Sequence, residues 1–328
     1  MRSAKLYSSL CLLLFCTYQC RNQTGSTGKD EPVSDTLEYI NPVMDKNLAD
    51  PCVMYDGGYY YLFATGRAED NRYIPIHRTK DFVHWEFIRG AVERGEKTDW
   101  NYIHFWAPEV INIHGLWHLY FTASPEYSPR NSGNHVGLAV SENIQGPYIN
   151  KGRVLPHSSI DGHVFIDDDG IMYLFYTIEH LNEDSLTAGQ IYMDTLVVPD
   201  RVAGHPIRII SHHEWQEGPF LQKRNGKYFL TYSCGAWTND TYHIRYAIAD
   251  HPGGPYTEQP DTILKSNKMV KGPGHHYMFT GRNGKDWIVY HGWDTAFTAR
   301  YPRIDRIFFR DNTISSDGPT YTRQKLNR

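Results

Sequence analysis

The chain has 328 residues, of which 40% are hydrophobic and 14% are aromatic, enough apolar material for a sizeable core. Its 33 basic and 37 acidic residues give a net charge of −4, and no basic run is present. Nucleic-acid binding needs clustered Lys and Arg to neutralise phosphates, so no nucleic-acid partner is expected. The aromatic excess instead favours β-sheet and flat stacking surfaces.

Residues 1–20 are predicted to be a secretory signal. Arg2 and Lys5 supply positive charge at its start, and the apolar run 6–15 that follows is too short to span a bilayer. We therefore expect the chain to be exported, with contact to the membrane only through its N-terminal segment.

Two cysteines at the end of this signal favour a lipid anchor. The stretch from Cys16 to Cys20 resembles a loose bacterial lipobox, so Cys20 is the predicted acylation site and Cys16 the second choice. An ordinary cleaved signal is the alternative. Residues 21–36 are polar, which predicts a flexible tether. The folded domain then spans 37–328 and lies in the periplasm or, through the lipid, at the outer membrane.

One short pattern recurs five times downstream of the tether. A turn glycine precedes a run of β-branched and aromatic residues at 57–63, 115–121, 170–176, 226–232 and 284–290. From Gly58 onward, the repeated glycines are spaced by 57, 55, 56 and 58 residues. No long amphipathic helical pattern intervenes. Short strands in units of this length predict an all-β, five-bladed β-propeller; a β-sandwich, the alternative, does not normally repeat in this way.

Each copy also carries a polar residue shortly before its glycine. These residues are Asp50, Glu109, Asp161, Glu217 and His275. In a propeller the first strand of each blade lines the central channel, so the five side chains should converge at one end of the axis. A single Asp before Pro is often only a turn residue. The shared position in all five copies favours a functional site.

Carboxylates gathered in a cleft suit one kind of chemistry. They repel one another and lose solvation, which raises some of their pKa values. One carboxylic acid can then hold a proton near neutral pH, while an ionised partner activates water or attacks directly. This division of roles is that of glycoside hydrolysis. The aromatic excess fits it, because sugars stack on flat side chains.

Five short strings resemble glycoside hydrolase family 43, in that family's order: Ala49–Pro51, Trp106–Val110, Ile160–Phe165, Glu217–Phe220 and Gly272–His275. The match runs over about residues 41–309. A single string such as Asp-Pro is weak evidence, whereas the ordered set is specific. The resemblance implies an inverting five-bladed propeller that hydrolyses glycosides of arabinose, xylose and related sugars.

The resemblance also implies a role for each of three carboxylates. Asp50 corresponds to the general base that activates water, and Glu217 to the general acid that protonates the departing oxygen. Asp161 corresponds to a third carboxylate, which orients the acid and raises its pKa through its negative charge. Inversion needs room for a water molecule, so the carboxyl groups of Asp50 and Glu217 should stand roughly 6.5–9.5 Å apart.

Three further residues are expected to serve the sugar pocket. Trp106 resembles its aromatic wall, although a core tryptophan is equally consistent with this position. Arg300 resembles an arginine that contacts sugar hydroxyls, with Arg303 and Arg306 as alternatives. His275 resembles a histidine near the axis that in many members helps to hold a structural calcium ion, a cation that itself prefers oxygen ligands.

The expected activity is the release of a terminal α-L-arabinofuranose or β-D-xylose from a plant-type polysaccharide or oligosaccharide by a monomeric enzyme. An endo-acting arabinanase or a galactofuranosidase is the alternative on this scaffold; the stretches 93–105 and 125–134 could close the pocket for exo action. A non-catalytic sugar-binding propeller is an alternative of another class. A retaining hydrolase of the sucrose-cleaving type is disfavoured by Ala49 before Asp50. No coenzyme motif is evident, so none should be required.

Overall fold

The computed structural model describes residues 38–127, 133–180, 186–210 and 214–326. The predicted signal, the tether and the Cys20 anchor lie outside these residues. Thr36–Arg328 form one compact unit, and every regular element described in it is a β-strand. The all-β prediction is therefore confirmed. Within the described part of the chain, no helix is long and apolar enough to cross a bilayer.

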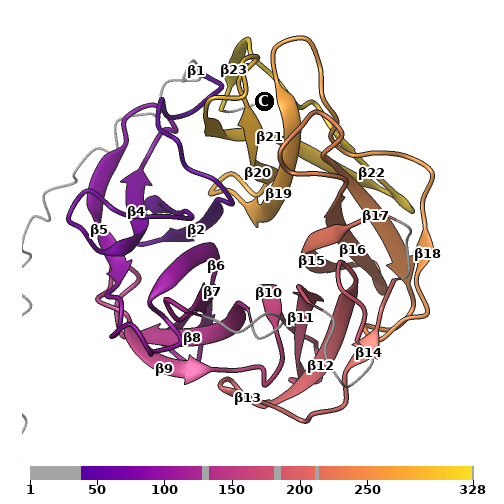
Figure 1. The fold of residues 1–328 in the computed structure, drawn as a ribbon. Helices are drawn as coiled ribbons and strands as arrows, with labels where there is room; N and C mark the ends of the chain where they lie inside the picture. Colours follow the sequence, from indigo (N-terminus) through magenta and orange to yellow (C-terminus); the bar gives the residue numbers. More distant parts are fainter. Residues whose placement is uncertain (1–37, 128–132, 181–185, 211–213, 327–328) are drawn as a thin grey trace, which may run out of the picture. The chain divides into compact units, whose positions relative to one another are not determined.

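Five antiparallel sheets, the blades, succeed one another along the chain and surround a common axis (Figure 1). Blade 1 contains β2 (Cys52–Asp56), β3 (Tyr59–Phe63), β4 (Tyr73–Thr79) and β5 (Glu86–Val92). Blade 2 contains β6 (Ile103–Ile113), β7 (Leu116–Ser124), β8 (His135–Ser141) and β9 (Ile149–Arg153). Blade 3 contains β10 (Ser159–Ile166), β11 (Met172–Ile178), β12 (Ile191–Val198), β13 (Arg201–Val202) and β14 (Ile207–Arg208).

The last two blades have the same order of strands. Blade 4 contains β15 (Gln216–Arg224), β16 (Lys227–Cys234), β17 (His243–Ala249) and β18 (Thr257–Glu258). Blade 5 contains β19 (Lys271–Thr280), β20 (Asp286–Trp293), β21 (Arg300–Arg310) and β22 (Thr313–Ser316). In every blade the first strand lies nearest the axis (Figure 1). The predicted five-bladed propeller is confirmed.

The repeated glycines lie in the hairpins that join the first two strands of each blade. Their φ angles run from 71° to 85°, in a region that glycine adopts without the penalty of a Cβ atom. These residues are Gly58, Gly115, Gly170, Gly226 and Gly284. A Cβ atom built at any of them would meet nothing within 4 Å. The turn conformation, not crowding, therefore explains why this residue recurs.

The ring is closed by the N-terminal segment of the domain. Strand β1 (Glu38–Ile40) pairs with β23 (Arg323–Lys325), as Figure 1 shows. The Asn41 side chain donates to the carbonyl of Ile304 at 2.9 Å and accepts from its N–H at 2.9 Å. Tyr39 also donates to this carbonyl, at 2.8 Å. The residues before blade 1 are thus bonded to β21 of blade 5.

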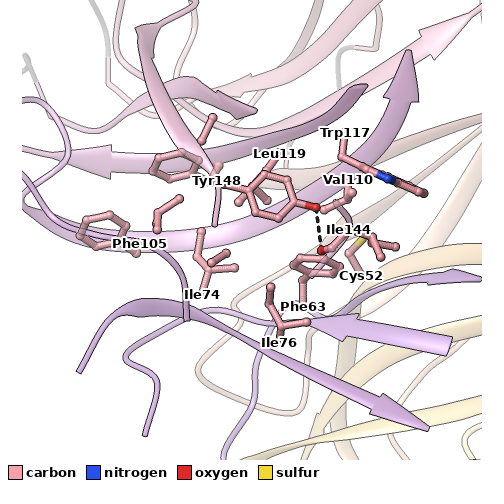
Figure 2. Packing of buried hydrophobic residues seen from close by; sticks show 14 of the residues in the cluster. Cys52, Phe63, Ile74, Ile76, Phe105, Val110, Trp117, Leu119, Ile144 and Tyr148 are labelled. Carbon is pink, nitrogen blue, oxygen red and sulfur yellow. Dashed lines mark hydrogen bonds between the residues drawn. The ribbon is translucent and has the colours of Figure 1, made fainter. Parts of the chain in front are cut away.

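The core is divided among the junctions between blades. Five buried clusters each combine residues of two neighbouring blades. In the cluster of blades 1 and 2, Phe63 packs near Val110 and Leu119, and Tyr148 donates to the Ile144 carbonyl at 3.0 Å (Figure 2). Each blade is covered on both faces by its two neighbours in the ring. Its second strand is therefore apolar along nearly its whole length, which is the run seen in the sequence.

Candidate active site

A pocket of about 690 Å³ opens at one end of the propeller axis. All six residues predicted for the site line it: Asp50, Trp106, Asp161, Glu217, His275 and Arg300. They come from all five blades. The fold therefore brings together side chains that are up to 250 residues apart in the sequence.

The inner strands reach the pocket through backbone kinks. Within or just before the first strand of each blade, a residue at an equivalent point has a φ between 47° and 62°: Asp50, Ala107, Asp161, Gly218 and His275. In β6, His104 has a positive φ as well, at 60°. In four blades the N–H of the equivalent residue donates to a side chain of the preceding blade, which lies on the second strand or, for Thr65, two residues after it. The bonds are Asp50 to His291 at 3.2 Å, Ala107 to Thr65 at 2.8 Å, Asp161 to Thr122 at 3.1 Å and His275 to Ser233 at 2.8 Å.

This pattern corrects the predicted alignment of the five polar residues. Ala107 and Gly218, not Glu109 and Glu217, are structurally equivalent to Asp50 in the kinked position. Bulges interrupt the pairing of the inner strands in blades 2 to 5, and the kinked residue stands eight residues before the repeated glycine in blades 1, 2 and 4 but nine before it in blades 3 and 5. Glu217 still reaches the pocket from the residue before the kink. Glu109, two residues after it, does not line that pocket.

Asp50 lies among groups that favour its ionised form. Its Oδ2 accepts from the Thr65 hydroxyl at 2.5 Å. Its Oδ1 is 3.0 Å from His291 Nδ1, 3.5 Å from an Arg300 nitrogen and 3.6 Å from His275 Nδ1. Burial alone would raise the pKa of Asp50, but His275, Arg300 and His291, which surround the carboxylate, together hold it far below its usual range.

Asp161 is shifted in the opposite direction. Burial and the nearby carboxylates of Glu217 and Asp50 outweigh His275 and raise the pKa of Asp161 to about 7. The backbone N–H of Gly218 donates to its Oδ2 at 3.0 Å. Asp161 can therefore keep a proton near neutral pH while Asp50 is ionised.

Both oxygens of Glu217 accept hydrogen bonds. Tyr242 donates to Oε1 at 2.6 Å, and the indole of Trp215 donates to Oε2 at 2.7 Å. Burial raises the pKa of Glu217 above its ordinary value, although His275 and these two donors act to lower it. Since Asp161 and Glu217 lie side by side, they titrate as a pair.

His275 and Arg300 supply the positive charge of the pocket. His275 Nδ1 lies 3.6 Å from Asp50 and 3.8 Å from Asp161. Burial would lower the pKa of His275, but Asp50, Asp161 and Glu217 outweigh it and raise the pKa. The guanidinium carbon of Arg300 lies 4.6 Å from the ring centre of Trp237. Arg303, one of the alternatives to Arg300, is buried and does not line the pocket.

Trp106 stands in the pocket wall rather than in the core. Its ring lies on that of His104, with centres 4.4 Å apart and an angle of 22° between the planes. Deeper along the axis, Glu109 is paired with His163, which accepts from the N–H of Leu221 at 2.9 Å. That pair lies between blades 2 and 3, below the carboxylates of the pocket, beside a cavity of about 20 Å³ lined by Glu109 and by Asp161.

The residues around His275 form the one group near the pocket carboxylates, among those the structure describes, that could face a cation. Asp161, Glu217 and His275 each have one ligand atom within 4.8 Å of the others. Calcium takes six to eight oxygen ligands. This group offers two carboxylates that already accept hydrogen bonds, and an imidazole whose pKa is raised toward its cationic form. Among the described residues this donor set does not fit calcium.

The walls of the pocket differ from those expected. No described residue of 93–105 or 125–134 lines it, and Trp100 instead packs inward on Phe121 with ring centres 5.0 Å apart. The walls come from Glu179 and His180 after β11, Trp215 before β15, and Trp237 after β16. The expected closure by the earlier stretches is therefore wrong for their described residues.

Several residues of the site were missed from the sequence. Trp215 and Tyr242 hold Glu217, and Thr65 and His291 hold Asp50. A signal for the last two was present, because a hydroxyl or imidazole residue stands seven positions after every repeated glycine. These residues are Thr65, Thr122, Thr177, Ser233 and His291.

A five-bladed propeller with a pocket of buried carboxylates at its axis has the architecture of a glycoside hydrolase. The model of glycosyl hydrolases family 43 matches residues 39–314, so the chain belongs to this family. It is 27% identical to a β-D-galactofuranosidase of Aspergillus niger, over 83% of this chain and 82% of the relative. It is 28% identical to an extracellular exo-α-(1→5)-L-arabinofuranosidase of Streptomyces chartreusis, over 77% and 82%. A crystal structure of a thermostable family-43 glycoside hydrolase superposes with a TM-score of 0.77 at 29% identity, covering 88% of this chain and 99% of that one.

Proposed function

We propose that this glycoside hydrolase is an inverting, exo-acting enzyme that releases a terminal α-L-arabinofuranose or β-D-xylose. The observation that carries the proposal is the unequal surroundings of three carboxylates in one pocket. Asp50 is kept ionised by the charges that face it, whereas the Asp161–Glu217 pair holds a proton near neutral pH. Similarity to an exo-arabinofuranosidase supports the pentose.

Asp50 is the proposed general base. It takes a proton from a water molecule while the water oxygen attacks the anomeric carbon of the terminal sugar. The attack comes from the side opposite the leaving oxygen, so the anomeric configuration inverts. The hydrogen bond from Thr65 and the charge of Arg300 fix the carboxylate in its ionised form. Its separation from Glu217, expected at roughly 6.5–9.5 Å, stays a prediction.

Glu217 is the proposed general acid. It donates a proton to the leaving oxygen as the bond from that oxygen to the anomeric carbon breaks. Asp161 is the proposed third carboxylate, which acts through charge, because a negative neighbour disfavours ionisation of Glu217. Asp161 and Glu217 share one proton, and this is the proton that Glu217 donates as the acid. A sugar that displaces Trp215 removes a donor that favours the Glu217 carboxylate, and so moves this proton toward Glu217.

Three side chains are proposed to bind the sugar in the pocket. The exposed face of Trp106 offers a stacking surface for the C–H face of the ring. Arg300 and His275 offer N–H donors to its hydroxyls, and both already face Asp50. His275 and Arg300 would therefore hold the sugar next to Asp50, the proposed base.

A galactofuranosidase is the second candidate. The observation in its favour is the similarity to a β-D-galactofuranosidase across most of both chains. Arabinofuranose and galactofuranose share a five-membered ring and differ in the group beyond it. The space next to Glu179 and His180 at the pocket wall would have to accept that larger group.

We further propose that the chain is exported. Residues 1–20 would act as the signal, Cys20 as the lipid anchor, 21–36 as the tether and 37–328 as the catalytic domain. A relative named extracellular supports export. The anchor is tested by labelling cells with an alkyne-tagged fatty acid and comparing the wild-type chain with Cys20→Ala and Cys16→Ala.

The activity is tested with the nitrophenyl glycosides of α-L-arabinofuranose, β-D-xylose and β-D-galactofuranose, together with linear arabinan. We expect turnover of a pentoside, and a loss of roughly 10²- to 10⁴-fold in kcat for Asp50→Asn and for Glu217→Gln. Sugar binding without turnover of any substrate by the wild-type protein would identify a binding propeller instead. Galactofuranoside turnover alone would establish the second candidate.

A further inference from the structure

An aromatic surface adjoins the pocket on the rims of blades 4 and 5. Trp237, in the loop after β16, lines the pocket and is 43% exposed. Trp293, at the end of β20, lies nearly parallel to it, with ring centres 6.2 Å apart and planes at 12°. The ring of Phe297 lies 6.0 Å from that of Trp293 and is also exposed. We call these three residues the aromatic rim.

The rim is held in a fixed arrangement. The indole N–H of Trp293 donates to the backbone carbonyl of Trp237 at 2.7 Å. The guanidinium carbon of Arg300 lies 4.6 Å from the ring centre of Trp237 and 5.6 Å from that of Trp293. Because these rings are already ordered, a ligand that stacks on them loses little binding free energy to ordering. Aromatic side chains left in water beside a pocket are typical of a binding surface.

The position of the rim matches the path of a sugar chain. Below the carboxylates the axis holds the buried Glu109–His163 pair and a cavity of only about 20 Å³. A chain whose terminal sugar meets the carboxylates therefore extends toward the pocket mouth. The leaving oxygen must lie beside Glu217, which is on blade 4. The same blade carries Trp237 at its rim.

We propose that the aromatic rim binds the leaving-group part of a neutral, unbranched sugar chain. The sugar after the cleaved bond stacks on Trp237, and the following one reaches Phe297. This inference rests on the proposed function, because it takes the terminal sugar to occupy the pocket. Binding at the aromatic rim makes the enzyme favour longer linear oligosaccharides over disaccharides, although each turnover cuts only one bond.

The kinetic test uses linear α-1,5-arabino-oligosaccharides and β-1,4-xylo-oligosaccharides of two and five sugars. For each protein, kcat/KM of the pentasaccharide is divided by that of the disaccharide. We expect Phe297→Ala to lower this ratio at least fivefold. Trp237→Ala removes a contact that both substrates make, so it should lower kcat/KM for the disaccharide as well as for the pentasaccharide. Tyr321→Ala, which removes an aromatic residue that is 47% exposed and does not line the pocket, should keep the wild-type ratio. An unchanged ratio in Phe297→Ala, or an unchanged kcat/KM for both substrates in Trp237→Ala, overturns the inference, while turnover itself still supports the proposed function.

Binding is measured separately, so that the rim can be judged even without turnover. All three proteins in this experiment carry Glu217→Gln: one has no further change, one also has Phe297→Ala and one also has Tyr321→Ala. Each is titrated with both pentasaccharides in a calorimeter. The Kd of the bound pentasaccharide should rise at least fivefold in Phe297→Ala only. An equal Kd in all three proteins, or no binding of either pentasaccharide, would contradict the rim proposal.

Discussion

The indole N–H of Trp215 donates to Oε2 of Glu217 at 2.7 Å, from a side chain that is 37% exposed at the pocket wall. The second donor to Glu217, Tyr242, is fully buried and lies parallel to the ring of His291. Both donors stabilise the carboxylate, the form of Glu217 that has no proton to give. Trp215 is the donor that an incoming sugar can reach and displace.

Removing this donor should shift the pH dependence of the enzyme. In Trp215→Phe the ring remains but the N–H is lost, so the pKa of Glu217 rises further. A hydrogen bond to a charged group contributes about 1.5–3 kcal/mol, so the alkaline limb of kcat/KM should move up by about one pH unit or more. The pH profile on a nitrophenyl pentoside measures this shift. Trp85→Phe, which loses a bond to the Phe82 carbonyl outside the pocket, serves as the control. Identical profiles for all three proteins would exclude the proposed effect of Trp215.

Thr65 is predicted to position the base. Its hydroxyl donates to Asp50 and accepts from the N–H of Ala107, so it joins two kinked strands. Thr65→Val keeps the shape but loses both bonds. We expect kcat to fall by roughly 10- to 100-fold with little change in KM, and the free energy of unfolding to fall by about 1–3 kcal/mol. Thr65→Ser keeps the hydroxyl, so it should keep most of the wild-type kcat and most of the wild-type free energy of unfolding.

The equivalent residue of blade 3 supplies the matched control. Thr177 stands at the same position in its repeat, and its buried hydroxyl has no hydrogen-bond partner among the described residues. Thr177→Val should therefore leave kcat unchanged and leave stability equal or higher. If Thr65→Val behaved like Thr177→Val in both measurements, the positioning role would be lost.

Asp161 should make the stability of the fold depend on pH. Its pKa is raised to about 7 in the folded chain, above the ordinary value of about 3.9. The folded state therefore binds this proton more tightly than the unfolded state, and ionisation of Asp161 costs stability as pH rises from about 4 to about 7. Asp161→Asn removes this cost. Its unfolding free energy should exceed that of the wild type at pH 8 by a few kcal/mol, and the difference should shrink toward pH 4.

Thermal or urea unfolding at pH 4.5, 6 and 8 measures the difference between these two proteins. Asp261→Asn, the same substitution at an exposed position, is measured for comparison at each pH. A difference for Asp161→Asn that stayed constant, or grew toward acid pH, would show that the raised pKa is not a property of the folded site.

The sequence predicts the blades and the three carboxylates well, because both depend on a repeat. Turn glycines and apolar second strands recur in every unit, and the kinked Asp50, Asp161 and His275 share one position. In blade 2 the predicted polar residue is Glu109, six residues before Gly115, although Ala107 has the eight-residue spacing of Asp50. In blade 4 Glu217 has the nine-residue spacing of Asp161, but the kink is at Gly218.

The donors to Glu217 could not be found in this way. Trp215 comes from the residues before β15, and Tyr242 from the loop before β17. Neither belongs to the repeated part of a blade, and an aromatic residue in a loop is most often part of the core. Their contact with Glu217 depends on the three-dimensional path of two loops. The residues that hold Asp50 differ, since Thr65 and His291 stand in the repeat and could be recognised from it.

Asp50 is proposed to deliver a water molecule to the face opposite the oxygen that Glu217 protonates. Proton NMR of the first sugar released, recorded before the anomers interconvert, tests this role. A nitrophenyl α-L-arabinofuranoside should give β-L-arabinofuranose as the first product, and a β-D-xyloside should give α-D-xylose. Release of the same anomer as in the substrate would contradict this role, because that outcome requires a covalent intermediate on one of the carboxylates.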